Sequence, residues 1–144
     1  MTAVDGRADA ESIHIGEELP PFSVLLTLQR LVMEAAANRD FAPIHYDGVA
    51  ARDSGAPEVY VNTTFIETLF EALLRSWAGL AARIRVIEFS MKAFNCVGDE
   101  IIAGGAVTAL RDDGRERVAE LNIWIEGPRG RTVTGGAVVA FPHT

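Results

Sequence analysis

An acid and an imidazole lie close together in the first third of the sequence, on either side of a proline: Asp40, Pro43 and His45. Proline fixes its own φ angle and keeps the preceding residue, Ala42, out of the helical region, so we expect a bent, extended turn here rather than a helix. Such a turn can direct both side chains into one pocket. Imidazole titrates near neutral pH, so a carboxylate and an imidazole in one pocket can take a proton from water and deliver it elsewhere.

Spacing alone does not make this pair catalytic. Asp40 can simply end a helix, and His45 can be a structural histidine held by hydrogen bonds. A position in a loop favours the functional interpretation, because binding and catalytic groups tend to lie on loops that a rigid scaffold holds in place. The elements on either side of the turn must supply that scaffold.

A helix is predicted on the N-terminal side of the turn. Thr27 is a suitable N-cap residue, and apolar residues recur at helical spacing from Leu28 to Ala37. The apolar stripe stops at Asn38 and Asp40. Asp40 is therefore expected to follow directly after the end of this helix.

A longer helix is predicted on the C-terminal side, from Thr63 to Trp77, with Asn62 or Thr63 as its N-cap. Apolar residues occupy nearly every direction around it, and the charged residues form one narrow strip. A helix with so little polar surface is expected to be wrapped by other elements on most of its sides.

Strands account for most of the remaining chain. A short apolar run at residues 22–26 predicts the first, and apolar and polar residues alternate over residues 83–93 and 118–126. Two further strands are predicted at residues 99–110 and 132–141. A change of parity predicts a bulge near Val86, and Gly104-Gly105 and Gly135-Gly136 predict bends. This order of elements predicts an α+β fold in which a curved antiparallel sheet wraps round a long central helix.

The turn also resembles a known motif, and the match runs over Asp40-Phe41-Ala42-Pro43-Ile44-His45-Tyr46-Asp47. The motif is that of the MaoC-like dehydratases, the (R)-specific enoyl-CoA hydratases of hot-dog fold, and reads Asp, any residue, Asn, Pro, an aliphatic residue, His, any residue, Asp. This chain departs from it at Ala42. The resemblance extends over roughly residues 22–141. One branch of the family, the small subunits of heteromeric hydratases that act on steroid side-chain CoA thioesters, is similar at Val59-Tyr60-Val61-Asn62-Thr63 and at Trp77-Ala78-Gly79.

The resemblance implies a hot-dog fold and a catalytic role for Asp40 and His45. In the family the two side chains act from one side of the substrate, which implies syn addition of water to a 2-enoyl thioester and an (R)-3-hydroxyacyl product. Either residue can give the Cα proton, and the sequence does not distinguish them. The CoA thioester is itself the substrate, so no cofactor is implied. No metal site is expected either, because the histidines at positions 14, 45 and 143 lack the spacing of metal ligands.

Negative charge that develops on the thioester oxygen needs hydrogen-bond donors. The start of the helix at Thr63 offers free backbone N–H groups and the positive end of the helix dipole. Most relatives read His-Gly-Met where this chain has Tyr60-Val61-Asn62, so the resemblance implies that the N–H of Val61 or Asn62 binds the oxygen and that Tyr60 lines the acyl site. Loss of the glycine brings Cβ atoms close to the substrate. Asn62 also has the simpler interpretation of a helix cap.

Composition limits the class of protein. With 144 residues, of which 49% are hydrophobic, the chain fits a loosely ordered polar tail at residues 1–12 and a single hot-dog domain at residues 13–144. A formal net charge of −7 gives no positive field for nucleic acid or a membrane surface, and no apolar run is long enough to cross a membrane. Cys96 is the only cysteine, so a reducing, cytoplasmic location is expected.

Two other functions are compatible with the same resemblance. A hot-dog acyl-CoA thioesterase would release free CoA instead of adding water. A non-catalytic acyl-CoA-binding subunit would serve a catalytic partner, and the departures at Ala42 and at Tyr60-Val61-Asn62 agree with that function. Hot-dog domains commonly pair edge to edge, so a homodimer, or a heterodimer of hot-dog subunits, is expected.

Overall fold

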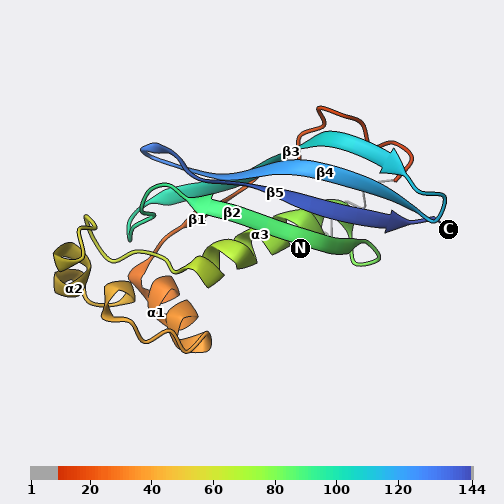
Figure 1. Ribbon diagram of the computed structural model, residues 1–144. Helices are drawn as coiled ribbons and strands as arrows, with labels where there is room; N and C mark the ends of the chain where they lie inside the picture. The colour runs from red at the N-terminus through yellow and green to blue at the C-terminus, as the bar shows by residue number, and fades with distance from the viewer. Residues whose placement is uncertain (1–9, 144) are drawn as a thin grey trace, which may run out of the picture.

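The computed structural model describes residues 10–143. Most of the tail predicted for residues 1–12 therefore lies outside the described residues, and the division into a tail and one domain remains a prediction. The segment that precedes the first strand runs beside the sheet: the Leu19 N–H donates to Gly105 O, and the Val107 N–H donates to Glu17 O, both at 2.9 Å. Figure 1 shows a curved sheet, one long helix along one of its faces, and a smaller helical layer at one end.

Five strands form one antiparallel sheet in the order β1-β3-β4-β5-β2. They are β1 (Phe22–Leu25), β2 (Arg83–Met91), β3 (Glu100–Asp112), β4 (Glu116–Gly127) and β5 (Gly130–Pro142). The turns that join β3 to β4 and β4 to β5 contain Gly114 and Gly130, both with positive φ. The predicted α+β fold with a curved antiparallel sheet is confirmed.

The long helix α3 (Thr63–Ala78) packs on the inner face of this sheet. The ring centroids of Phe70 in α3 and Phe89 in β2 are 5.4 Å apart. The ring centroids of Trp77 in α3 and Phe141 in β5 are also 5.4 Å apart. The other side of α3 is exposed, and Ala72 lies on it. The prediction that this helix is wrapped on most sides is wrong for the single chain, because the sheet curves over only one side of it.

The smaller layer contains α1 (Leu28–Ala37), the 3₁₀ turn η1 (Pro43–His45) and α2 (Gly48–Asp53). Helix α1 begins as predicted, since Thr27 Oγ1 accepts the Arg30 N–H at 3.2 Å. Asp47 caps α2, its Oδ1 accepting the Val49 N–H at 2.8 Å.

Of the helices in residues 10–143, none combines the length and the apolar content needed to cross a bilayer.

The extended turn predicted before His45 is only partly right. Ala42 is extended, with φ −61° and ψ 125°, but Pro43 begins the short helical turn η1. The restriction that proline imposes falls on the residue before it, whereas its own fixed φ suits the first position of a helical turn. His45 is therefore at the end of a turn of helix rather than in an extended segment.

The sheet contains the predicted bulge, because the register of β2 against β5 shifts between Ile84 and Val86. At the two glycine pairs the register is continuous. At Gly104 and Gly135 the neighbouring strand comes too close for a side chain. A Cβ at Gly104 would lie 2.7 Å from Trp124 Nε1, and a Cβ at Gly135 would lie 2.0 Å from the backbone oxygen of Glu88.

Replacing Gly135 by alanine should lower the free energy of unfolding by about 3 kcal/mol, because a backbone oxygen cannot turn away from the added methyl group. Gly136→Ala is the matched control, since the nearest atom to its Cβ, Leu121 O, lies at an ordinary 3.5 Å; this variant should change stability by less than about 1 kcal/mol. Urea unfolding of both proteins measures the difference. Equal stability of the two variants would contradict the close contact at Gly135.

Candidate active site

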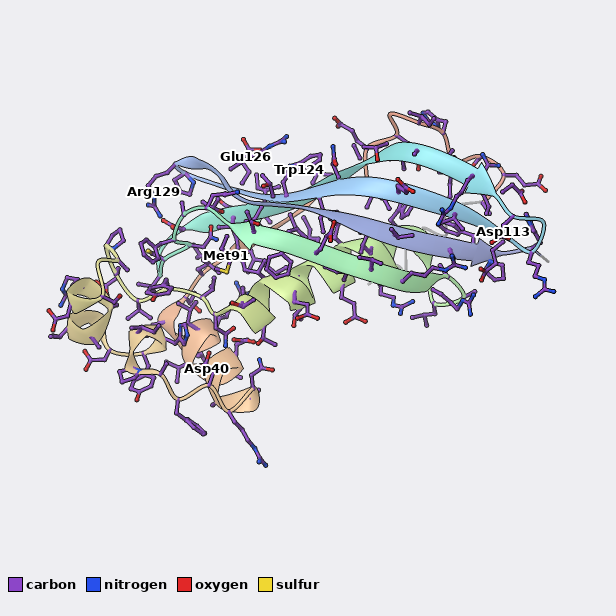
Figure 2. All side chains as sticks on the ribbon, viewed as in Figure 1. Asp40, Met91, Asp113, Trp124, Glu126 and Arg129 are labelled. Carbon is purple, nitrogen blue, oxygen red and sulfur yellow. The ribbon has the colours of Figure 1, made fainter. Side chains whose placement is uncertain are left out.

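The end of α1 fixes the position of Asp40. After the C-cap Asn38, the Arg39 N–H donates to Ala36 O at 3.1 Å, and the Asp40 N–H donates to Ala35 O at 2.9 Å. This pair of bonds is a Schellman motif, which requires a left-handed residue at the position that Arg39 occupies with φ 55°. Figure 2 shows Asp40 at the end of the molecule that carries α1, with Asp113 at the opposite end.

Two contacts hold the ring of His45. Its Nδ1 lies 2.8 Å from the backbone oxygen of Tyr60, and because a carbonyl can only accept, Nδ1 carries a hydrogen. Its Nε2 lies 3.2 Å from Asp40 Oδ2. The side chain of His45 is 7% exposed and that of Asp40 is 36% exposed, so a ligand can reach the pair from the Asp40 side. The fold thus brings the two predicted residues together.

Asn62 joins this pair to the start of α3. Its Oδ1 accepts the Phe65 N–H at 2.9 Å and so caps the helix, while its Nδ2 donates to Asp40 Oδ2 at 3.1 Å. The other carboxylate oxygen of Asp40, Oδ1, accepts the Ala42 N–H at 3.4 Å. The prediction of a cap at Asn62 is confirmed, and its side-chain contact with Asp40 is a further role that the sequence did not indicate.

Tyr60 and Val61 also lie beside the pair. The Tyr60 ring meets the His45 ring edge-on, with centroids 5.5 Å apart, and also packs on Phe94. The Val61 N–H is already engaged, because it donates to Asn95 O at 3.0 Å. This amide is therefore not free to bind a substrate oxygen, which leaves Asn62 as the remaining donor of the two that were predicted.

The backbone amides that remain free follow Val61 in the chain. Within residues 10–143, the N–H groups of Asn62, Thr63 and Thr64 have no acceptor, as is usual in the first turn of a helix. The sequence predicted free N–H groups at the start of this helix, although it named only Val61 and Asn62 as the donors. The amides of Thr63 and Thr64 lie next to the Asn62 side chain that contacts Asp40.

A second acid, Glu34 of α1, lies at the same site and was not predicted. Asn38 Nδ2 donates a hydrogen bond to its Oε1. Burial raises the pKa of Glu34 above its ordinary value and outweighs the opposing effect of His45, and the charge of Asp40 raises it further. No sequence signal identified Glu34, because a glutamate within a helix is usually a solvated surface residue.

Glu34 also lines an apolar groove. This groove has a volume of about 480 Å³, and its lining residues are Val24, Arg30, Met33, Glu34, Phe65 and Leu69. The groove lies between α1 and α3, and neither Asp40 nor His45 is among its lining residues.

The arrangement of Asp40 and His45 defines what the site can do chemically. Because Nδ1 of His45 donates to Tyr60 O, Nε2 is the atom that faces Asp40. Nε2 and a carboxylate oxygen need either a proton between them or a water molecule that both contact. The pair can therefore hold one proton or one water and pass a proton between its members. In the described part of the chain, no group of three or more His, Cys, Asp or Glu side chains is placed to hold a metal ion.

Comparisons with known proteins agree with this chemistry. No protein-family model matches the chain. It is 29% identical over 136 residues to the (R)-specific enoyl-CoA hydratase of Aeromonas caviae, which covers 92% of this chain and 98% of that protein. It is also 29% identical over 98 residues to the 3-oxo-4,17-pregnadiene-20-carboxyl-CoA hydratase beta subunit of Mycobacterium tuberculosis, covering 68% and 76% of the two chains.

Two solved structures share the fold. The (R)-hydratase from A. caviae involved in PHA biosynthesis has a TM-score of 0.83 and 30% identity, covering 92% of this chain and 99% of that chain. The ChsH1-ChsH2 complex from M. tuberculosis has a TM-score of 0.82 and 24% identity, covering 89% and 98%, which shows the fold alone. The chain therefore belongs to the MaoC-like dehydratase and (R)-specific enoyl-CoA hydratase family of hot-dog fold, as predicted.

Asn62→Ala should lower the free energy of unfolding by about 1–2 kcal/mol, because the first turn of α3 loses its cap. Asn62→Ser is the matched control: a serine hydroxyl still caps the helix, so this variant should be about 1 kcal/mol more stable than the alanine variant. Neither variant can donate an amide hydrogen bond to Asp40. Thermal and urea unfolding measure the difference, and equal stability of the two variants would contradict the capping role.

Proposed function

We propose that this protein is an enoyl-CoA hydratase that adds water reversibly to a 2-enoyl-CoA thioester, with Asp40 and His45 as its catalytic pair. The observation that carries the proposal is the 3.2 Å contact between His45 Nε2 and Asp40 Oδ2 in a chain that is similar over its length to an (R)-specific enoyl-CoA hydratase. In the reverse direction the same site dehydrates a 3-hydroxyacyl-CoA.

Asp40 and His45 act on one water molecule placed between the pair and the substrate double bond. One member of the pair removes a proton from this water as its oxygen bonds to Cβ, and the other delivers a proton to Cα, so one water is consumed and no charge is left over. Both side chains lie on one side of the substrate, which gives syn addition and an (R)-3-hydroxyacyl product. Either side chain can serve as the proton donor.

Backbone amides at the start of α3 stabilise the thioester oxygen. As the oxygen bonds to Cβ, negative charge moves onto the thioester carbonyl, and free N–H groups at a helix N-terminus are suitable donors for it. The amides of Asn62, Thr63 and Thr64 are available, whereas that of Val61 is bonded to Asn95 O. The Tyr60 ring packs against the His45 ring and forms that side of the site. Water, acid and base suffice for this reaction, so it needs no cofactor.

The acyl group is fatty or derived from a steroid side chain. The groove of about 480 Å³ between α1 and α3 is lined mainly by apolar residues, among them Met33, Phe65 and Leu69. A relative named for a pregnadiene carboxyl-CoA substrate supports the steroid class, and the A. caviae hydratase supports the general 2-enoyl-CoA class. The substrate of the protein is an acyl-CoA, and the protein acts in the cytoplasm.

A second hot-dog subunit completes the protein in this proposal. One relative is named a beta subunit and one fold match is a two-protein complex. Leu28, Val32 and Met33 on α1 and Phe41 after it are large, apolar and exposed, as expected of a surface that a partner covers. The partner is a second copy of this chain or a related subunit. If the chain has no activity alone, the heteromeric, non-catalytic function is favoured.

Asp40→Asn and His45→Ala should each lower kcat/KM for hydration of a 2-enoyl-CoA by about 10²–10⁴-fold, because each removes one partner in proton transfer. Asp47→Asn is the matched control. Asp47 belongs to the same motif, but its side chain caps α2, and asparagine caps equally well, so this variant should keep near wild-type activity. Loss of absorbance of the enoyl thioester measures turnover.

Full activity in both the Asp40 and the His45 variant would rule out the catalytic pair. Release of free CoA, detected with a thiol reagent, would favour the thioesterase alternative instead. Tight binding of an enoyl-CoA without turnover, by the chain alone, would favour the non-catalytic subunit. Fatty and steroid enoyl-CoA thioesters assayed side by side, with the mass of the protein in solution measured in the same samples, identify the acyl class and the oligomer.

A further inference from the structure

The buried polar side chains of the described residues are few: His45, Asn62, Asn95 and Thr132. His45 and Asn62 belong to the proposed site. Asn95 and Thr132 are 1% and 2% exposed, and the proposed reaction uses neither of them. Burial of a polar side chain costs folding free energy unless hydrogen bonds replace those made with water. The contacts of these two side chains therefore show what they are there to hold.

Thr132 of β5 attaches Asn95 to the sheet. Its hydroxyl donates to Asn95 Oδ1 at 2.6 Å. Its backbone oxygen accepts the N–H groups of Lys92 and Ala93 at 2.7 and 3.2 Å. One residue of the sheet thus fixes both the start of the loop after β2 and the side chain of Asn95 within that loop.

The Asn95 amide is only partly satisfied. Its nitrogen, Nδ2, has no hydrogen-bond partner, and among residues 10–143 it is the one buried side-chain nitrogen or oxygen of which this is true. A buried donor without an acceptor destabilises the fold. An apolar side chain of similar shape would avoid that cost, so stability alone does not account for an asparagine at position 95.

The backbone of Asn95 contacts the peptide group that joins Tyr60 to Val61. The N–H of this group donates to Asn95 O at 3.0 Å, and its oxygen accepts from His45 Nδ1 at 2.8 Å. One peptide group is therefore held between Asn95 and the imidazole. Hydrogen bonds at the two ends of one amide polarise each other, so the bond to Asn95 makes Tyr60 O a stronger acceptor for His45.

The orientation of the His45 ring decides which nitrogen faces Asp40. With the hydrogen of Nδ1 on Tyr60 O, it is Nε2 that lies 3.2 Å from Asp40 Oδ2. The hydrogen bond of one ring nitrogen sets the state of the other. If the peptide group of Tyr60 moved, the ring would lose this acceptor, and the tautomer with its hydrogen on Nε2 would become accessible.

We propose that Asn95 is a positioning residue of the site: Thr132 holds it in place, and through the peptide group of Tyr60 it fixes the orientation and the tautomer of His45. The inference rests on the proposed function for its effect on turnover. Asn95 touches neither the substrate nor a reacting atom. Its action passes through three printed lengths of contact, from Thr132 to Asn95, to the peptide group, and to the imidazole.

Thr132→Val and Thr132→Ser test this inference as a pair. Valine keeps the shape of threonine but lacks the hydroxyl that holds Asn95, whereas serine keeps the hydroxyl and lacks only a methyl group. In Thr132→Val, kcat for a 2-enoyl-CoA should fall by about 10–100-fold, because the base and acid are misplaced, and KM should change little. In Thr132→Ser, kcat should stay close to that of the wild type. Equal kcat in the two folded variants would overturn the proposal.

The double variant Asn95→Leu, Thr132→Val separates positioning from stability. It removes both partners of the buried hydrogen bond together with the unpartnered amide, and apolar replacement of both partners can leave stability nearly unchanged. Its urea midpoint should therefore lie close to that of the wild type, while kcat falls as in Thr132→Val. Wild-type kcat in this double variant would refute the positioning role.

Asn122→Leu, Thr108→Val is the matched control. It makes the same two chemical changes at exposed positions of β4 and β3, away from the loop after β2. Its kcat should equal that of the wild type. An equal loss of kcat in the control and in the buried double variant would overturn the proposal.

NMR of the imidazole nitrogens gives a readout that needs no substrate. At a pH where His45 is neutral, the wild-type ring should carry its hydrogen on Nδ1, and in Thr132→Val the form with the hydrogen on Nε2 should appear beside it. The chain has three histidines, and the signals that disappear in His45→Gln identify the relevant ring. A His45 spectrum in Thr132→Val identical to that of the wild type would overturn the proposal.

The outcomes separate this inference from the proposed function. If the wild-type protein hydrates no enoyl-CoA, the proposed function fails, and the His45 spectrum still decides whether Asn95 positions the ring. If the wild type is active and Thr132→Val keeps full kcat, the function stands and the role of Asn95 is refuted. A loss of kcat in Thr132→Val, together with a changed His45 spectrum and an active Thr132→Ser, supports both.

Discussion

The side chain of Asn62 is the connection on which the site depends. Its oxygen caps α3, and its nitrogen donates to Asp40. One side of α3 is held by the core against the curved sheet, so the position of its first turn is well defined. The hydrogen bond from Asn62 therefore fixes the carboxylate of Asp40, which lies in a loop, relative to the start of α3. The loop itself has little apolar burial of its own with which to fix Asp40.

A second connection holds the imidazole. The backbone oxygen of Tyr60 accepts from His45 Nδ1, and two residues later the same strand-like segment reaches Asn62. One short piece of chain before α3 therefore fixes both members of the pair. This explains how Asp40, before the 3₁₀ turn, and His45, its last residue, meet at 3.2 Å although neither lies in a regular strand or long helix.

Two costly features gather at this end of the molecule. Arg39 adopts a left-handed conformation with φ 55°, which glycine adopts with less strain. Glu34 is a partly buried acid without a salt bridge in the described chain. At the opposite end, the largely buried carboxylate of Glu116 is paired with both Arg83 and Arg85. Strain and buried charge near a proposed catalytic pair are typical of sites selected for chemistry rather than for stability.

The local elements were predictable because their signals are local. Thr27 and Asn62 act as the helix caps that their positions indicated, and the parity change near Val86 marks a real bulge. One prediction that depended on long-range packing failed, and one of two alternatives for the donor amide was removed. Helix α3 is covered on one side only, because apolar composition does not say how far a sheet curves. The amide of Val61 is engaged, because its acceptor, Asn95 O, comes from a distant loop.

By itself the sequence determined the α+β class, the family and the identity of the Asp40–His45 pair, since helix caps, residue periodicity and a short motif are all written in neighbouring positions. The tertiary structure alone decided that the pair is in contact, that Asn62 joins it to α3, and that Glu34 belongs to the site. The longest of those contacts in sequence links Asp40 and Asn62, which are 22 positions apart. The physical reason is that such contacts form only when the core fixes the helices relative to one another, and no local pattern encodes that geometry.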